Sequence, residues 1–360
     1  MQSKSRTLQY TFATTHRMPL LLLFFLLLCS ALLSAQSLPI DWFRDYNPQV
    51  AAAEDALHNN NPDAALEYYR LAFSAPADPH TNDLYNAALA ARAADRPDLI
   101  RQYLGELAQL GIPVDYFDRH RLELDHPRLD WYALRGQLLR YQTQYQRTFD
   151  PELADCYERV AYRDVVIRTA NPPGQVRLTQ DSLNMVGLVG CIETYGFPAQ
   201  RHLRRSDPTD ESYPYYLPLL HELERVNSTG NDRFGFLPLL EYLAQSGTIE
   251  TQTYMDLLST QHARLGSPGG YGTTSVILVQ DGTDDLYRIV YPLATVQDYE
   301  DRRGQLGVQS FRERTQLLID LHTGALGTHF SYNIPRHRTL VAYPLEIADV
   351  LRLERVGVVR

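Results

Sequence analysis

The side chains best suited to chemistry in this sequence lie in its second half, where His221 and His262 are the strongest polar candidates. His221 stands at the end of an apolar stretch, where an imidazole that titrates near neutrality can act as a general base. A histidine in that context can equally be a core residue bonded to a backbone carbonyl, so both interpretations stay open. If His221 serves a site, Asn184, Tyr271 and Arg302 are its expected companions.

Motifs for metals and cofactors are missing from the sequence. The pair His221-Glu222 lacks a second histidine four residues further on, so the zincin pattern fails. Histidines and a carboxylate from separate helices could assemble a metal site, but no spacing demands one. The glycine-rich residues 266–272 are better explained as a tight connection than as an anion-binding loop, because Pro268 interrupts their amides. No cofactor and no metal are predicted.

Lysine is almost absent, and this limits the chemistry. Lys4 is the only lysine in the chain. Without Lys4, Schiff-base catalysis and a phosphate-binding Gly-Lys loop are both excluded. Removing residues 1–35 leaves 31 arginines against 43 acidic residues, a net charge of −12. Such an acidic protein repels phosphate backbones, so no nucleic-acid partner is expected.

Residues 1–35 have the layout of a secretory signal peptide. Basic residues precede an apolar run over residues 20–29, and small residues follow up to Ala35. The apolar run is too short for an ordinary membrane span. We therefore predict cleavage after Ala35, export to the periplasm or the extracellular space, and no stable membrane span in the mature protein. A retained anchor is the alternative; lipidation at Cys29 is disfavoured because Leu28 precedes it.

Two cysteines, Cys156 and Cys191, survive the predicted cleavage. In an oxidising compartment they could form one disulfide that closes a loop of roughly 35 residues, which would stabilise the fold by about 3–4 kcal/mol. Each also sits in an apolar helical context, so two buried free thiols are an equal alternative. A zinc ribbon is excluded, since neither cysteine has a partner at short spacing.

The first part of the mature chain, residues 38–125, has a helical repeat pattern. Prolines and apolar spacing predict helices over residues 48–58, 62–73, 81–94 and 97–111. A lag of 34 residues relates Ala53 to Ala87 and Tyr69 to Tyr103. Residues 48–113 therefore resemble a degenerate pair of tetratricopeptide repeats. This resemblance implies stacked hairpins, whose role is to pack on the following domain or to bind a peptide.

Further helices are predicted over residues 126–320. Apolar spacing indicates them at residues 129–145, 151–169, 181–194, 215–226, 236–246, 251–264 and 296–318, the last broken near Gly304 and Gly307. Residues 275–279 and 286–291 are β-branched and predict a hairpin or a strand-loop-strand. Residues 338–343 have the same character, so the extension 321–360 is expected to add a short strand.

Several polar and glycine-containing elements of this second half occur in a fixed order. Asp164 and Arg168 end one helix, Asn184 lies in the next, and His221 follows an apolar run. Residues 195–198, 246–249, 271–273 and 301–307 complete the set. Residues 150–315 thereby resemble an uncharacterised bacterial helical domain of unknown function. The chain departs from that pattern at Gly269 and at residues 260–261, so the resemblance implies a fold more strongly than an activity.

The expected fold is mainly α: helical-repeat hairpins packed on an α-helical domain, with a small β element near the C-terminus. The function expected first is binding or scaffolding in the cell envelope, with an envelope protein or a peptide as partner. The alternative is a small-ligand-binding or hydrolase-like enzyme that uses His221 with Asn184, Tyr271 and Arg302, where Arg302 or Arg303 would hold an anionic substrate.

Overall fold

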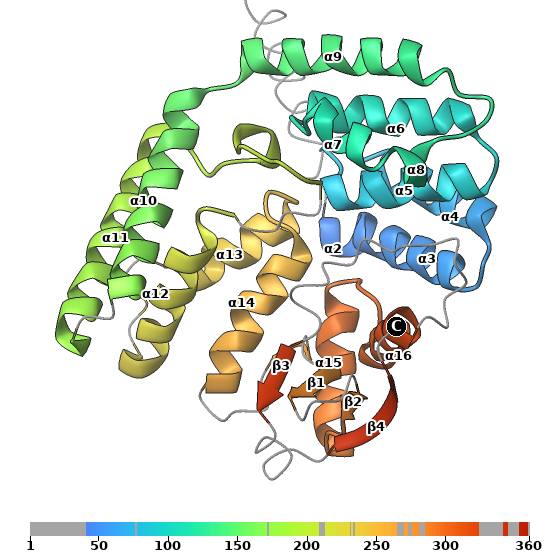
Figure 1. Cartoon of the computed structure of the whole chain (residues 1–360). Helices are drawn as coiled ribbons and strands as arrows, with labels where there is room; N and C mark the ends of the chain where they lie inside the picture. The colour runs from blue at the N-terminus through green and yellow to red at the C-terminus, as the bar shows by residue number, and fades with distance from the viewer. Residues whose placement is uncertain are drawn as a thin grey trace, which may run out of the picture. The chain divides into compact units, whose positions relative to one another are not determined.

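Figure 1 shows a computed structural model of the chain, in which helices dominate. The described residues are 41–75, 78–170, 173–208, 213–230, 232, 235–264, 270–272, 276–280, 285–323, 341–344 and 353–358. The predicted signal peptide lies outside them. Residues Asp41–Arg360 form one compact unit. The mainly helical fold with a small β element near the C-terminus is confirmed.

The first helices form two hairpins, α3–α4 and α5–α6. Their bounds are Asn47–His58, Pro62–Ala72, Thr81–Ala93 and Pro97–Gln109. α4 and α6 each begin with a proline, whose missing N–H leaves no helical hydrogen bond unmade at this position. Ala87, Ala88, Ala90 and Ala91 of α5 are buried and allow neighbouring helices to approach closely. The four helices predicted over residues 48–111 are confirmed, with ends within two residues.

Short helices flank these hairpins. α2 (Trp42–Asp45) precedes them and begins at Asp41, whose carboxylate accepts a hydrogen bond from the Phe43 N–H at 3.1 Å. Three helices follow the hairpins: α7 (Val114–Arg119), α8 (Arg121–Leu124) and α9 (Trp131–Thr148). Trp42 is fully buried and stacks on Tyr46, so this short segment is fixed in the core.

The next group of helices builds a second core. Its members are α10 (Pro151–Ala170), α11 (Gly174–Tyr195), α12 (Tyr216–Thr229), α13 (Phe236–Gln245) and α14 (Thr251–Arg264), with a 3-10 turn η1 (Gln200–His202). α10, α11 and α12 pack against one another, side by side in Figure 1. α11 begins at Gly174, seven residues before the predicted start. Its first turns are mostly exposed, so no apolar periodicity marks them.

The C-terminal part combines two helices with a four-stranded sheet. The helices are α15 (Leu293–Gln305) and α16 (Phe311–Thr323), and the strands are β1 (Val276–Gln280), β2 (Asp285–Ile289), β3 (Val341–Pro344) and β4 (Leu353–Val358). The strand order is β3-β1-β2-β4, with β1 antiparallel to β2 and parallel to β3. The predicted break near Gly304 and Gly307 separates α15 from α16.

Two hydrophobic cores underlie this arrangement. The first joins the helices up to α9 with Leu286 of β2 and with Leu317 and Leu318 of α16. The second lies among α10 to α14 and includes Leu306. Within the described residues, no helix is long and apolar enough to cross a membrane.

Candidate functional site

Helices α10 and α11 run antiparallel in a register that three contacts define. Cys156 and Cys191 form a disulfide, with Cα atoms 5.9 Å apart. One turn further along α10, Val160 faces Gly187, where an added Cβ would lie 3.3 Å from the valine side chain. One more turn brings Asp164 opposite Asn184 on α11. The disulfide therefore lies about 12 Å along α10 from Asp164, and it fixes the register on which the polar cluster depends.

Asp164 is the centre of that cluster. It is 1% exposed, and its Oδ1 accepts a hydrogen bond from Asn184 Nδ2 at 3.2 Å. The same oxygen lies 3.0 Å from Nδ1 of His221, which α12 contributes. Asn184 is in turn held by Gln180, whose Nε2 donates to its Oδ1 at 2.9 Å. One carboxylate oxygen thus joins three helices.

A second carboxylate, that of Asp181, lies one turn before Asn184 on the same face of α11. Asp181 is 5% exposed and accepts a hydrogen bond from Arg168 Nη2 at 2.7 Å. Burial raises the pKa of Asp181; Arg168 and His221 oppose this shift, and Asp164 adds to it. The cluster therefore contains two buried carboxylates and one guanidinium.

Two polar atoms of the cluster are buried without a hydrogen-bond partner in the described part of the chain: Asp164 Oδ2 and Arg168 Nε. One ligand atom from each of Asp164, Asp181 and His221 lies within 4.8 Å of the others. Carboxylate oxygens and an imidazole nitrogen are donors that divalent transition-metal ions accept. An imidazole oriented by a carboxylate can also act in proton transfer. The geometry is therefore suited to either kind of chemistry.

The structure brings together two of the four residues predicted to share a site. His221 and Asn184 meet at Asp164. Tyr271 and Arg302 lie beside α14 and α15 instead: the Tyr271 N–H donates to Ser259 Oγ at 2.9 Å, and Arg302 contacts the Gly270 carbonyl at 3.5 Å. Within the described residues, no hydrogen bond or ion pair joins these two pairs.

The neighbours of His221 distinguish between the two interpretations of this histidine. Its ring faces a carboxylate, whereas the core-histidine interpretation expected a backbone carbonyl. Glu222 is fully buried and accepts a hydrogen bond from Arg225 Nε at 2.8 Å, so it belongs to a separate ion pair. The side chain of His262 lies outside the described residues.

Sequence reasoning named neither Asp164, Arg168 nor Asp181 as site residues, although the first two belong to the set that carries the resemblance. The spacing of polar residues along the two helices could have indicated them. Asp164 and Arg168 are one helical turn apart on α10, and Asp181 and Asn184 are one turn apart on α11. Polar pairs on the facing sides of two adjacent helices indicate a shared cluster.

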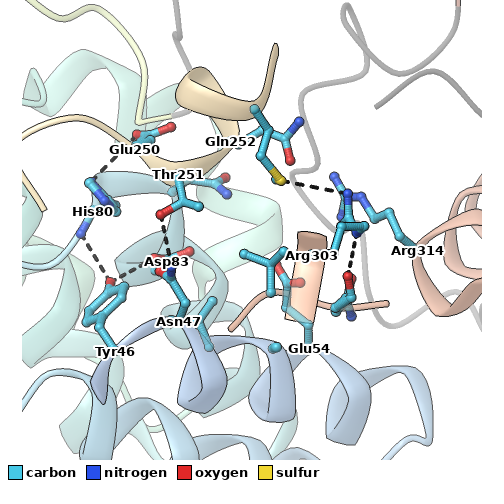
Figure 2. A pocket seen from close by; sticks show the side chains of 16 residues that line it. Tyr46, Asn47, Glu54, His80, Asp83, Glu250, Thr251, Gln252, Arg303 and Arg314 are labelled. Atoms are coloured by element: carbon cyan, nitrogen blue, oxygen red, sulfur yellow. Dashed lines mark hydrogen bonds and ion pairs between the residues drawn. The ribbon is translucent and has the colours of Figure 1, made fainter. Parts of the chain in front are cut away.

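A cavity of about 110 Å³ forms a second candidate region, shown in Figure 2. Parts of α3, α5, α14, α15 and α16 line it, together with the segment after α15. Asn47 ties two of these parts together, since its Nδ2 donates to Thr251 Oγ1 at 2.9 Å and to the Leu306 carbonyl at 2.8 Å. Most of the residues that line it are polar, and they carry both signs of charge.

No family model matches the chain, and the searches of curated proteins and of solved structures return no match. The resemblances to tetratricopeptide repeats and to a bacterial helical domain therefore stay predictions.

Proposed function

We propose that this chain is an exported protein that binds one divalent transition-metal ion through Asp164, Asp181 and His221. The observation that carries the proposal is Asp164 Oδ2, a buried carboxylate oxygen without a partner among the described residues. It belongs to a group of three metal-type ligands within 4.8 Å of one another. A lone partially satisfied oxygen of this kind is costly in a protein interior unless something binds it.

The charges of the cluster support a cation. Two carboxylates within 4.8 Å of each other repel by about 3 kcal/mol or more at an effective dielectric constant of 20. Arg168 offsets one of these charges through its bond to Asp181. A divalent ion between Asp164, Asp181 and His221 would offset both and would satisfy the open oxygen.

The donor set favours one class of metal. An imidazole nitrogen suits Zn²⁺, Fe²⁺ or Mn²⁺ better than Ca²⁺, which takes six to eight oxygen ligands. Three protein ligands leave a position for water or for a substrate, as in catalytic zinc sites. Arg168 and Asn184 hydrogen-bond the two carboxylates, the role that outer residues have around many metal sites.

Calorimetric titration of chelator-treated mature protein with Zn²⁺ and with Mn²⁺ tests the proposal. We expect one ion per chain for the wild type and no detectable binding for Asp181→Asn. The matched control is Asp155→Asn, which removes an exposed carboxylate from α10 and should bind like the wild type. Absence of binding to the wild type, or equal binding by Asp181→Asn, contradicts the proposal.

Export is the second part of the proposal, and the disulfide supports it. A Cys156–Cys191 disulfide is consistent with an oxidising compartment. The predicted cleavage after Ala35 makes Gln36 the first residue of the mature protein. N-terminal sequencing of the protein isolated from its native host should find Gln36, and an intact Met1 on folded protein would contradict export.

Scaffolding in the envelope is the second candidate function, and one surface favours it. α10 and α11 expose apolar side chains at helical spacing, namely Tyr162, Val165, Val166, Leu183 and Val186. Such a surface suits an apolar segment of an envelope protein. A photo-crosslinking residue at Val166 should capture one discrete partner in intact envelopes, whereas the same residue at exposed Tyr132 on α9 should not. Identical products at both positions would contradict it.

A further inference from the structure

The cavity of Figure 2 is a separate region, built from elements other than those of the Asp164 cluster. Its volume of about 110 Å³ greatly exceeds the about 10–15 Å³ that one water molecule requires. Room for several water-sized groups, surrounded by charged side chains, is what a small polar ligand needs.

Two arginines form one side of the cavity. Arg303 is 3% exposed, and its Nε donates to the Gln309 carbonyl at 2.6 Å. Its Nη1 contacts the Tyr271 carbonyl at 3.3 Å. Burial lowers the pKa of Arg303 to about 10, and the neighbouring Arg314 contributes to this shift. Glu300, Asp256 and Glu54 are close enough to Arg303 to interact electrostatically with it, and Glu54 also interacts with Arg314. Two adjacent guanidinium groups, one of them buried, favour an anion between them.

Acidic residues form the opposite side. Figure 2 shows Asp83 and Glu250 away from the two arginines, on the side that also holds Tyr46. Asp83 accepts a hydrogen bond from the Tyr46 hydroxyl at 2.7 Å. Burial raises the pKa of Asp83 well above its usual range, and Glu54 and Glu250 add to this effect. A cation on this side would favour the ionised carboxylates.

Two residues that line the cavity carry unsatisfied polar atoms. His80 is 5% exposed, lines the cavity, and its Nε2 has no partner in the described part of the chain. Asn82 Oδ1, also from the start of α5, is buried without a partner in the same described region. Most buried polar atoms in proteins are hydrogen-bonded. Two residues that line the cavity therefore keep hydrogen-bonding capacity that no described residue uses.

We infer that this cavity binds a small zwitterion with one carboxylate and one ammonium group, of the α-amino-acid type. The ligand carboxylate lies between Arg303 and Arg314, and its ammonium group points toward Asp83 and Glu250. The opposed charges of the two walls select a molecule that carries both charges. A simple anion would not engage the acidic wall, and a simple cation would not engage the arginines.

The test is a calorimetric and thermal-shift screen of the full mature chain against the proteinogenic L-amino acids, with acetate and methylammonium as single-charge probes. We expect at least one amino acid to bind, and both single-charge probes to bind at least about tenfold more weakly, as expected for the loss of one charge-assisted hydrogen bond. The methyl ester and the N-acetyl derivative of the tightest-binding amino acid should each lose a similar factor.

Arg314→Gln provides the protein-side control. It removes a half-buried cation from the wall and should weaken binding at least about tenfold. Arg312→Gln, an exposed position two residues away, should bind like the wild type. Asp181→Asn should also leave the affinity unchanged, which separates this inference from the metal site. Binding by no amino acid, acetate binding as tight as that of the amino acid, or full affinity in Arg314→Gln would overturn the inference.

Discussion

The Asp164 cluster and the cavity of Figure 2 are both polar regions, but they are assembled in opposite ways. The cluster comes from three successive helices. Among its described contacts, the one between His221 and Asp164 has the largest sequence separation, 57 positions. The cavity depends on contacts such as that between Asn47 and the Leu306 carbonyl, which are 259 positions apart. The cluster thus depends on the local register of α10 and α11, whereas the cavity depends on the packing of the chain's first and last helices.

The two regions should therefore respond independently to mutation. Changes that shift α10 against α11 should damage metal binding and leave the cavity intact. Changes at the ends of α3, α5 or α14 should have the reverse effect.

Removal of the disulfide should have the largest effect. Replacing Cys156 and Cys191 with serine should reduce the free energy of unfolding by about 3–4 kcal/mol, because the bridge closes a loop of 35 residues. Zn²⁺ affinity should fall with it, while amino-acid binding to the folded protein should persist. Urea denaturation with and without a reductant measures the stability term. Unchanged Zn²⁺ affinity in the folded double variant would show that α10 and α11 keep their register without the disulfide.

Acid should destabilise the cavity side through His80. Burial lowers the pKa of His80 to about 4, while an unfolded histidine titrates near 6.5. Between these values the unfolded state binds more protons, so the free energy of unfolding falls as the pH decreases from 6.5 to 4. This histidine alone contributes about 3 kcal/mol to that loss. Denaturant curves of wild type and His80→Asn over this range should converge as the pH falls; parallel curves would contradict the assignment.

Loss of the Tyr46 hydroxyl should have a smaller effect on the same side. Tyr46→Phe leaves buried Asp83 without the donor that holds it at 2.7 Å, at a cost of about 1–3 kcal/mol. Tyr132→Phe, at an exposed position on α9, should change stability little. Zn²⁺ binding should be unaffected in both variants, and a loss of metal affinity in Tyr46→Phe would show that the regions are coupled.

The smallest effect is expected from a pair of glycines on α11. Gly190→Ala meets no atom within 4 Å and should stabilise the helix by roughly 0.5–1 kcal/mol. Gly187→Ala places its Cβ 3.3 Å from Val160, so part or all of that gain should be lost as α10 moves outward. The difference between the two melting temperatures measures how tightly the helices meet. Equal increases in melting temperature for the two variants would show that the helices can adjust to an added Cβ at Gly187.

The contrast between the regions also explains what the sequence could predict. Apolar spacing and prolines were sufficient for the longer helices, but they failed at the start of α11, where the side chains are exposed. They also gave no separate prediction for the short helices α2, α7 and α8. His221 and Asn184 could be selected because each stands out in an apolar helix. Their common partner Asp164 could not be selected as such, because carboxylates are frequent on helices and only the pairing of α10 with α11 shows that it is buried.

The cavity was beyond sequence reasoning for a related reason. Arg303 could be considered only as an anion ligand beside Arg302, and nothing in the sequence places it near Asp83 or His80. Those residues are 220 or more positions from Arg303 along the chain, and no periodic pattern links them. Long-range packing alone brings the two walls together.

The most direct test of the central claim is an anomalous difference map from crystals of the mature protein soaked in Mn²⁺ and measured at a wavelength where manganese scatters anomalously. We expect one strong peak between Asp164, Asp181 and His221, and no peak there in crystals of Asp181→Asn. A wild-type map without a peak at this position, or with its main peak elsewhere, would contradict a metal site at these residues.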